Sequence, residues 1–139
     1  MKNQRLRIVF LLLLILTGCD KSPAPERQVT ATFSNGKPER VNIFQVVDGQ
    51  KKLVKEETYY FNGQMMRSRE LKDGYPHGVW REWFNNGQLR VEKHYRDGNL
   101  DGLQKGWYRN GAKFYEAEFA GGKLLHRREW KPDGTLRND

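Results

Sequence analysis

Residues 73–89 read DGYPHGVWREWFNNGQL and residues 97–113 read DGNLDGLQKGWYRNGAK, so turn residues and aromatic pairs recur with a 24-residue offset. Asn-Gly and Asp-Gly tolerate positive φ at both central positions of a type I′ turn, whose twist suits antiparallel strands. We therefore predict a hairpin turn at each of these pairs: Asn62-Gly63, Asp73-Gly74, Asn86-Gly87, Asp97-Gly98, Asn110-Gly111, Gly121-Gly122 and Asp133-Gly134. Asn35-Gly36 and Asp48-Gly49 extend the series upstream with looser spacing.

The segments between these turns alternate in the manner of β-strands. Leu89, Val91 and Tyr95 fall on one face of a strand, whereas Glu92 and His94 fall on the other. A fixed period indicates an array in which each unit contacts mainly its neighbours. The sequence predicts an all-β fold, an elongated antiparallel β-meander of hairpin repeats over residues 59–139. Residues 28–58 are expected to form a divergent N-terminal hairpin or cap, and no long helix is expected after the leader.

Aromatic residues recur at fixed places in each repeat. Shifting the sequence by 24 residues aligns three sets with one another: Leu71, Tyr95 and Phe119; Tyr59, Trp83 and Trp107; and Tyr60, Phe84 and Tyr108. Equivalent rings in neighbouring hairpins can stack and bury apolar area in a sheet that is too thin for a deep core. These aromatics are therefore predicted to be mainly structural, with an exposed stripe that faces a ligand as the alternative.

The first 18 residues have the composition of a bacterial secretory leader. Lys2, Arg5 and Arg7 precede an apolar run over residues 8–16. A helix of that length spans only ~14 Å, less than the ~30 Å hydrocarbon core, so a signal peptide is expected and not a transmembrane helix. Residues 1–18 are predicted to be this helical signal peptide.

The leader ends in Leu16-Thr17-Gly18-Cys19, which resembles a lipobox. Cleavage between Gly18 and Cys19 and acylation of Cys19 are predicted, and an incidental thiol is the alternative. Residues 19–27, which include two prolines, then form a flexible spacer. Acyl chains would anchor the protein stably in a membrane of the bacterial cell envelope, facing the periplasm. Asp20 resembles a signal for retention in the inner membrane, with the outer membrane as the alternative.

The charge of the mature chain restricts its partners. Cys19 is the only cysteine, so no intramolecular disulfide can form. Removal of residues 1–18 leaves 22 Lys and Arg against 17 Asp and Glu, a net charge of +5. An exported protein of this charge is expected to meet anionic lipid head groups or an acidic protein, and not nucleic acid.

The stretch YYFNGQMMRSRELKDGYPHGVWREWFNNGQLRVEKHYRDGNLDGLQKGWYRNG, residues 59–111, resembles the bacterial variant of the MORN (membrane occupation and recognition nexus) repeat. The resemblance extends to about residue 137 and weakens after Gly122, where His126 replaces a second glycine. Proteins of this type include the YwqK family antitoxins. The resemblance therefore implies an antitoxin or immunity function, in which a toxin is neutralised by direct binding without turnover.

Residues that could carry catalysis or bind a metal have simpler interpretations. His77, His94 and His126 are separated by 17 and 32 residues, which fits no compact metal site, so no metal and no cofactor are predicted. Four glycines with the spacing of a phosphate loop lack a following helix and are interpreted as turn residues: Gly74, Gly78, Gly98 and Gly102. Two acidic pairs, Glu70 with Glu118 and Glu92 with Glu116, lack an obvious cleft. They are expected to form cross-strand pairs with Arg67, Arg69, Arg90 and Lys93.

No catalytic residue is therefore predicted, and two binding functions remain open. The first is a non-enzymatic protein-binding lipoprotein that neutralises a toxin or effector. The second is an envelope-structural or lipid-surface protein, with an enzyme as a third, disfavoured class. Tryptophan and arginine are enriched at interface hot spots, and the candidate partner-binding residues are Trp80, Arg81, Trp83, Trp107 and Trp130.

Overall fold

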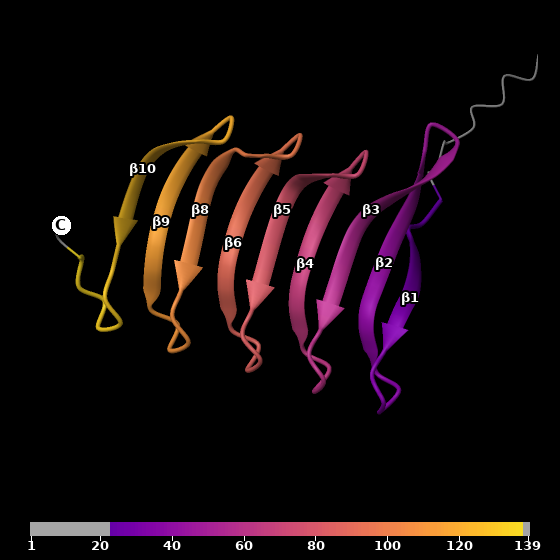
Figure 1. Cartoon of the computed structure of the whole chain (residues 1–139), viewed down its shortest axis with the longest axis horizontal. Helices are drawn as coiled ribbons and strands as arrows, with labels where there is room; N and C mark the ends of the chain where they lie inside the picture. The colour runs from indigo at the N-terminus through magenta and orange to yellow at the C-terminus, as the bar shows by residue number, and fades with distance from the viewer. Residues whose placement is uncertain (1–22, 138–139) are drawn as a thin grey trace, which may run out of the picture.

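The computed structural model describes residues 23–137, which form one open antiparallel sheet of ten strands and contain no helix. The strands are β1 Glu26–Thr32, β2 Pro38–Val47, β3 Gln50–Tyr59, β4 Met65–Lys72, β5 Tyr75–Trp83, β6 Leu89–Arg96, β7 Asn99–Leu100, β8 Gly102–Trp107, β9 Lys113–Ala120 and β10 Lys123–Glu129. They lie side by side in chain order, with the short β7 paired to β6 (Figure 1). The prediction of an all-β antiparallel meander is confirmed.

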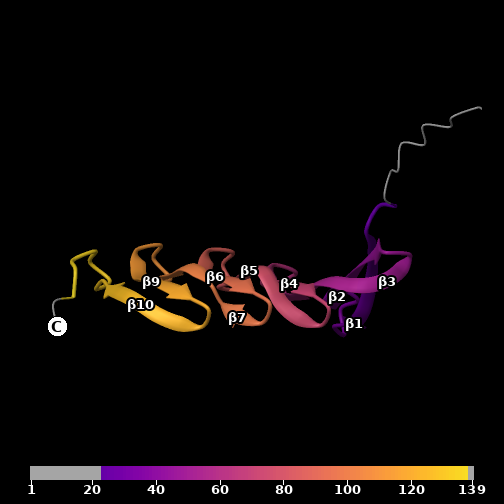
Figure 2. The ribbon, with the colours of Figure 1, turned by 90° about the horizontal axis from the view of Figure 1, so that it is seen from above.

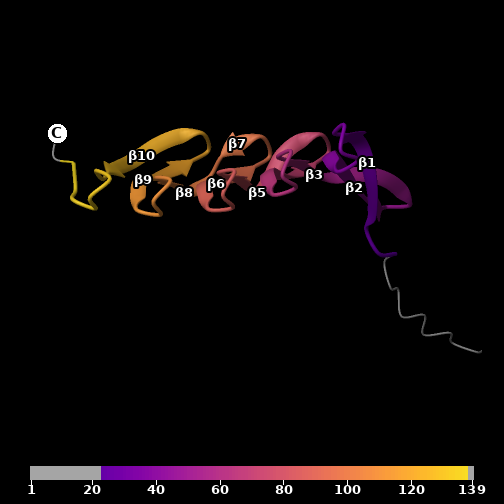
Figure 3. The same cartoon turned by 90° about the horizontal axis from the view of Figure 1, so that it is seen from below.

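The sheet is elongated and consists of a single layer, as the views from above and from below show (Figures 2 and 3). The predicted signal peptide and the lipidation site at Cys19 lie outside the described residues. Strand β1 begins at Glu26, so the last two residues of the predicted spacer already belong to the sheet. Within residues 23–137, no helix has the length and apolar composition needed to cross a membrane.

The turns along one long side of the sheet have two central residues with positive φ. Asp73 and Gly74 have φ values of 49° and 85°, and the same holds at Asp48-Gly49, Asp97-Gly98 and Gly121-Gly122. These values are those of the type I′ turns that the sequence predicts. Each of these turns links the two strands of a hairpin directly.

The Asn-Gly turns along the other long side are different, and the prediction of type I′ geometry is wrong for them. Gly63 has a φ of 90°, but Asn62 does not have positive φ. The loop is closed by Gly63 N–H donating to Tyr60 O and by Tyr60 N–H donating to Gln64 O, both at 2.8 Å. Asn62 Oδ1 accepts the N–H of Gln64 at 3.0 Å, an Asx turn that stabilises an asparagine without positive φ. The result is a three-residue loop with glycine in the left-handed region.

This loop recurs along the same side of the sheet. The same pattern of backbone and side-chain hydrogen bonds is built on Asn35, Asn86, Asn110 and Asp133. Neighbouring loops are also joined, since Asn62 Nδ2 donates to Asn85 O and Asn110 Nδ2 donates to Pro132 O. The repeat is thus held together along its loops as well as through its strands.

The interior of the sheet is shallow, and its most buried apolar side chains in the described residues are Val41, Ile43 and Ala117. Equivalent aromatic rings do not stack on one another within residues 23–137, contrary to the prediction. The close ring pairs join non-equivalent positions, such as Trp80 with Tyr95 and Tyr108 with Phe114. Two equivalent tyrosines instead donate to a backbone carbonyl of the next repeat, as Tyr60 OH does to Trp83 O at 2.8 Å.

Candidate protein-binding surface

Strand register divides the side chains of the sheet between two faces. Successive partners on one face, which we call the arginine-aromatic face, are Thr58, Arg67, Glu82, Val91, Gly106 and Tyr115. Successive partners on the other face, which we call the charge-ladder face, are Glu57, Ser68, Arg81, Glu92, Lys105, Glu116 and Arg128. From Arg81 onward this second row alternates in charge at every strand, so its side chains can neutralise one another.

Trp80 is held in place on the arginine-aromatic face. The guanidinium carbons of Arg67 and Arg69 lie 5.5 and 5.6 Å from its ring centroid. Its Nε1–H donates to Glu82 Oε1 at 3.2 Å, and Arg67 Nε–H donates to the same oxygen at 3.2 Å. The ring of Tyr95 lies 5.6 Å away on the other side. Burial, with Glu82 nearby, raises the pKa of Tyr95 above its ordinary value.

Next to Trp80, the arginine-aromatic face is hollowed between β2, β3 and β4. This arginine hollow has a volume of about 270 Å³ and is lined by Arg40, Glu56, Thr58, Arg67 and Arg69. Arg69 is ion-paired with Glu56, and Arg67 with Glu82. Arg40 has no ion pair with any residue from 23 to 137. The hollow therefore contains one arginine whose charge the described residues do not neutralise.

A second hollow adjoins the first near the Asn-Gly loops. This aromatic hollow has a volume of about 290 Å³, shares Arg40 and Thr58 with the arginine hollow, and is otherwise lined by Phe33, Glu39, Tyr59, Tyr60, Phe61 and Met66. The rings of Phe33 and Phe61 meet edge to face at 5.5 Å, and Phe61 is 58% exposed. Tyr59 of this second hollow donates to Glu57 on the charge-ladder face, so the two hollows do not form one surface. We call the arginine hollow, with Trp80 beside it, the groove.

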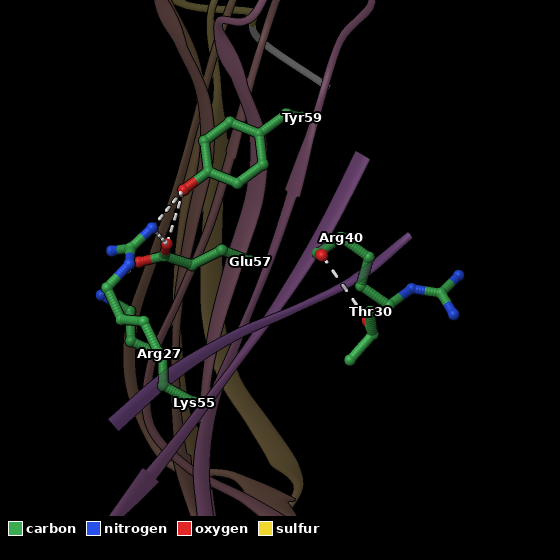
Figure 4. Close-up of polar contacts among 6 residues, drawn as sticks. All are labelled: Arg27, Thr30, Arg40, Lys55, Glu57 and Tyr59. Carbon is green, nitrogen blue, oxygen red and sulfur yellow. Dashed lines mark hydrogen bonds and ion pairs between the residues drawn. The ribbon is translucent and has the colours of Figure 1, made fainter. Parts of the chain in front are cut away.

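The N-terminal strands that carry this groove are fixed by a buried carboxylate on the opposite face (Figure 4). Glu57 Oε2 accepts Tyr59 O–H at 2.6 Å and lies 3.1 Å from Arg27, and Lys55 lies 3.2 Å from Oε1. Burial opposes ionisation of Glu57, but the hydrogen bonds from Tyr59 and Lys55 outweigh it, so its pKa is lowered. Arg27 thereby ties β1 to β3 across β2.

The five candidate binding residues do not form one surface. Trp80 lies on the arginine-aromatic face, whereas Arg81, the next residue, pairs with Glu92 at 2.7 Å on the charge-ladder face. Trp83 and Trp107 end β5 and β8 directly before Asn-Gly loops. Lys113 lies 4.7 Å over the ring of Trp130. Of the five, Trp80 is the one that touches the arginines of the hollow.

The titratable residues considered from the sequence have separate partners. His77 lies 3.2 Å from Asp97, His94 Nδ1 lies 2.7 Å from Leu103 O, and His126 lies 3.4 Å from Glu118. Glu70 accepts the backbone N–H of Val79 at 3.0 Å. The expected charge pairs therefore form with different partners, because register places Arg67 opposite Glu82 and Arg69 opposite Glu56.

Sequence reasoning missed the contribution of the N-terminal strands to the groove. Arg40, Glu56 and Thr58 belong to the segment expected to be a cap. None of them occupies a position that the 24-residue period marks, and Arg40 reaches the hollow only through the pairing of β2 with β3. A count of arginines on alternating positions of residues 38–47 and 65–72 is the signal that could have found the groove.

Comparison with known proteins identifies the repeat. A MORN repeat variant matches residues 76–97, which span β5, an Asn-Gly loop and β6. The match supports a MORN-repeat protein and indicates a repeat-type binding protein. No curated protein matches the chain, and no solved structure matches it.

Proposed function

We propose that this chain is a non-enzymatic protein-binding lipoprotein of the antitoxin or immunity type, which neutralises a toxin or effector by direct binding. The arginine hollow beside Trp80, on the arginine-aromatic face, is the observation that carries the proposal. Arginine and aromatic side chains dominate interface hot spots, particularly where neighbouring groups hold them in place. Arg67 and Arg69, stacked over Trp80, meet that description.

The proposed location is the bacterial cell envelope, with the sheet facing the periplasm. Acylation of Cys19 would supply the tether, and Asp20 favours the inner membrane. The partner would then be a toxin or effector that acts in the envelope. Neutralisation would be stoichiometric, because each copy of the repeat sheet blocks the toxin molecule that it binds and does not turn over.

A pull-down tests this proposal. Full-length protein with a C-terminal tag, solubilised from its own membranes, should retain one protein at close to equal molar amounts. Trp80→Ala should reduce the yield strongly, whereas Arg81→Ala, on the opposite face, should leave it unchanged. In cells that make the co-purified protein, deletion of the gene for this chain should allow that protein to act as a toxin. Absence of a specific partner together with a harmless deletion would contradict the antitoxin function.

A second function, lipid-surface binding, is favoured by the opposite end of the sheet. Strand β10 is an edge strand in which Leu124 and Leu125 are exposed next to Lys123, Arg127 and Arg128. Such a mixture suits the boundary of an anionic membrane. Co-sedimentation with anionic vesicles, lost at high salt and in Arg127→Gln/Arg128→Gln, would support it. Sedimentation that is indifferent to salt would contradict it.

A further inference from the structure

We propose that the outer edge of β10 receives an extended acidic segment of a partner protein, which pairs with it as a further antiparallel strand. Strand β10 lies at the C-terminal edge of the sheet, and β9 is its only partner strand within residues 23–137 (Figure 1). The arginine hollow, between β2, β3 and β4, belongs to the other end of the sheet. The two sites can therefore be tested separately.

The backbone of β10 presents hydrogen-bonding groups to the outside of the sheet. Trp130 N–H donates inward to Phe114 O at 2.8 Å, whereas Glu129 O accepts the N–H of Arg137 at 2.8 Å on the outer side. The direction of hydrogen bonding alternates along an antiparallel strand, and the register between Arg127 and Glu129 is regular. The N–H and C=O of Arg127 therefore also point outward, where an added strand can pair with them.

The charge-ladder face specifies an acidic residue on that added strand. Lys105 lies between Glu92 and Glu116, one on each neighbouring strand. Arg128 faces Glu116 in the same row, but within residues 23–137 no strand lies on its outer side. If the alternation continues, an Asp or Glu of the added strand lies beside Arg128.

The charges around β10 match two acidic residues. Residues 113–137 contain six Lys or Arg against four Asp or Glu, a net charge of +2. Lys123 and Arg128 are the cations of β10 that have no ion pair within residues 23–137. Register places both on the charge-ladder face, since Lys123 lies opposite Ala120 and Arg128 opposite Glu116. Two carboxylates on one face of the added strand would neutralise them.

Leu124 specifies an apolar residue on the opposite face of the added strand. It lies opposite Phe119 of β9 and is 47% exposed. The register shift at Leu125 makes that residue a bulge. Five consecutive residues of a regular added strand would thus face, in order, Arg128, Arg127, His126, Leu124 and Lys123. The first and fifth of them are expected to be acidic and the fourth apolar.

Other occupants fit this edge less well. Pairing of β10 with β10 of a second copy would bring two basic strands together, and like charges on edge strands prevent such self-association. A lipid surface supplies negative charge but no row of N–H and C=O groups for the backbone at Arg127. An acidic strand supplies both, so the charges of β10 select it over a second copy.

Titration of full-length protein in detergent with a dye-labelled peptide tests the proposal. The peptide is capped and reads Thr-Glu-Thr-Thr-Leu-Glu-Thr, which places its two glutamates and its leucine as described. Replacement of either glutamate by glutamine should weaken binding about two- to fivefold, the range for a partly exposed ion pair. Replacement of the leucine by serine should also weaken it.

Two N-methylated peptides test for strand pairing itself. A methyl group on the nitrogen of the residue opposite Arg127 removes the N–H that would donate to Arg127 O, and should weaken binding about tenfold. A methyl group on the next nitrogen removes an N–H that would point away from β10, and should have little effect. Equal binding of the two methylated peptides would overturn the proposal, in favour of an anionic surface such as lipid if the glutamates still matter.

Variants of the protein locate the site. Arg128→Gln should remove the preference for the first glutamate over glutamine, whereas Arg81→Gln, on the same face but paired with Glu92, should leave it intact. Asp139 follows Glu116 by 23 residues in the sequence, so Asp139→Asn is a further control. It should leave the affinity unchanged. A tenfold rise would mean that Asp139 itself competes for the edge, and would overturn the assignment to a partner strand.

The peptide titration and the pull-down can fail independently. If the peptides bind as expected but no partner is retained and deletion is harmless, the strand-pairing site stands and the antitoxin function does not. If a partner is retained but the two methylated peptides bind equally, the protein-binding function stands and the strand-pairing site does not.

Discussion

The phenolic O–H of Tyr60 donates to the carbonyl oxygen of Trp83 at 2.8 Å. This hydrogen bond joins the residue that begins one Asn-Gly loop to the residue before Phe84, which begins the next such loop. Tyr108 and Trp130 repeat this hydrogen bond at 2.9 Å. Phe84 occupies the intermediate position and has no hydroxyl to donate toward Trp107. The series of loop hydrogen bonds is therefore interrupted at one place.

Phe84→Tyr should restore that hydrogen bond and raise the free energy of unfolding by ~0.5–1.5 kcal/mol. Tyr60→Phe should lower it by a similar amount. Urea denaturation followed by circular dichroism measures both changes. An unaltered midpoint for Tyr60→Phe would mean that the bond contributes nothing to stability.

Gly87→Val should destabilise its loop, because Gly87 has a φ of 86° and a β-branched residue is strained there. The expected loss is at least ~1–2 kcal/mol, the cost of left-handed backbone for an ordinary residue. Gly87→Asn is the control, since asparagine tolerates this conformation and should cost less. Thermal unfolding that ranks the two variants equally would contradict the turn geometry.

Gly106→Ala should be destabilising for a different reason. An added Cβ would lie 2.3 Å from a ring carbon of Tyr115, so the ring has to move off the strand. We expect a loss of ~1–3 kcal/mol in chemical denaturation, as for overpacking elsewhere. In a Tyr115→Ala background the same substitution should cost almost nothing. If Gly106→Ala lowers the free energy of unfolding by the same amount in that background, the strain lies in the backbone and not in the contact with the Tyr115 ring.

Acid should destabilise the N-terminal strands through Glu57. Its pKa is lowered in the folded state, so it stabilises the fold above the unfolded value of ~4.3, and this contribution is lost as the pH falls through the folded pKa. Glu57→Gln should cost ~1–3 kcal/mol at neutral pH and flatten the dependence of stability on pH below about 4. Glu26 forms an exposed ion pair with Lys51, so Glu26→Gln should change neither the stability at neutral pH nor its dependence on pH.

The sequence predicted the fold because the turn residues specify it locally. Asp73-Gly74 and its equivalents require positive φ, and the alternation around Val91 assigns the strand faces. The sequence analysis did not distinguish the type I′ Asp-Gly turns from the three-residue Asn-Gly loops. That difference depends on a side-chain hydrogen bond, such as the one from Gln64 N–H to Asn62 Oδ1. Ring stacking was predicted wrongly because the period reports equivalent positions and not the neighbours that register brings together.

The candidate site was less accessible to sequence reasoning. The sequence grouped Trp80 and Arg81 as candidates for one surface, although adjacent residues of a strand point to opposite faces. Arg40 became a candidate only when β2 was placed next to β3. Long-range pairing of a divergent strand cannot be obtained from a repeat period.

Each strand of the main path pairs only with the strands before and after it. Tension applied between the two ends would therefore load the hydrogen bonds of one strand pair at a time, as in a zipper, and not all of them in parallel. Such a sheet should yield at low force and lengthen by one strand per step.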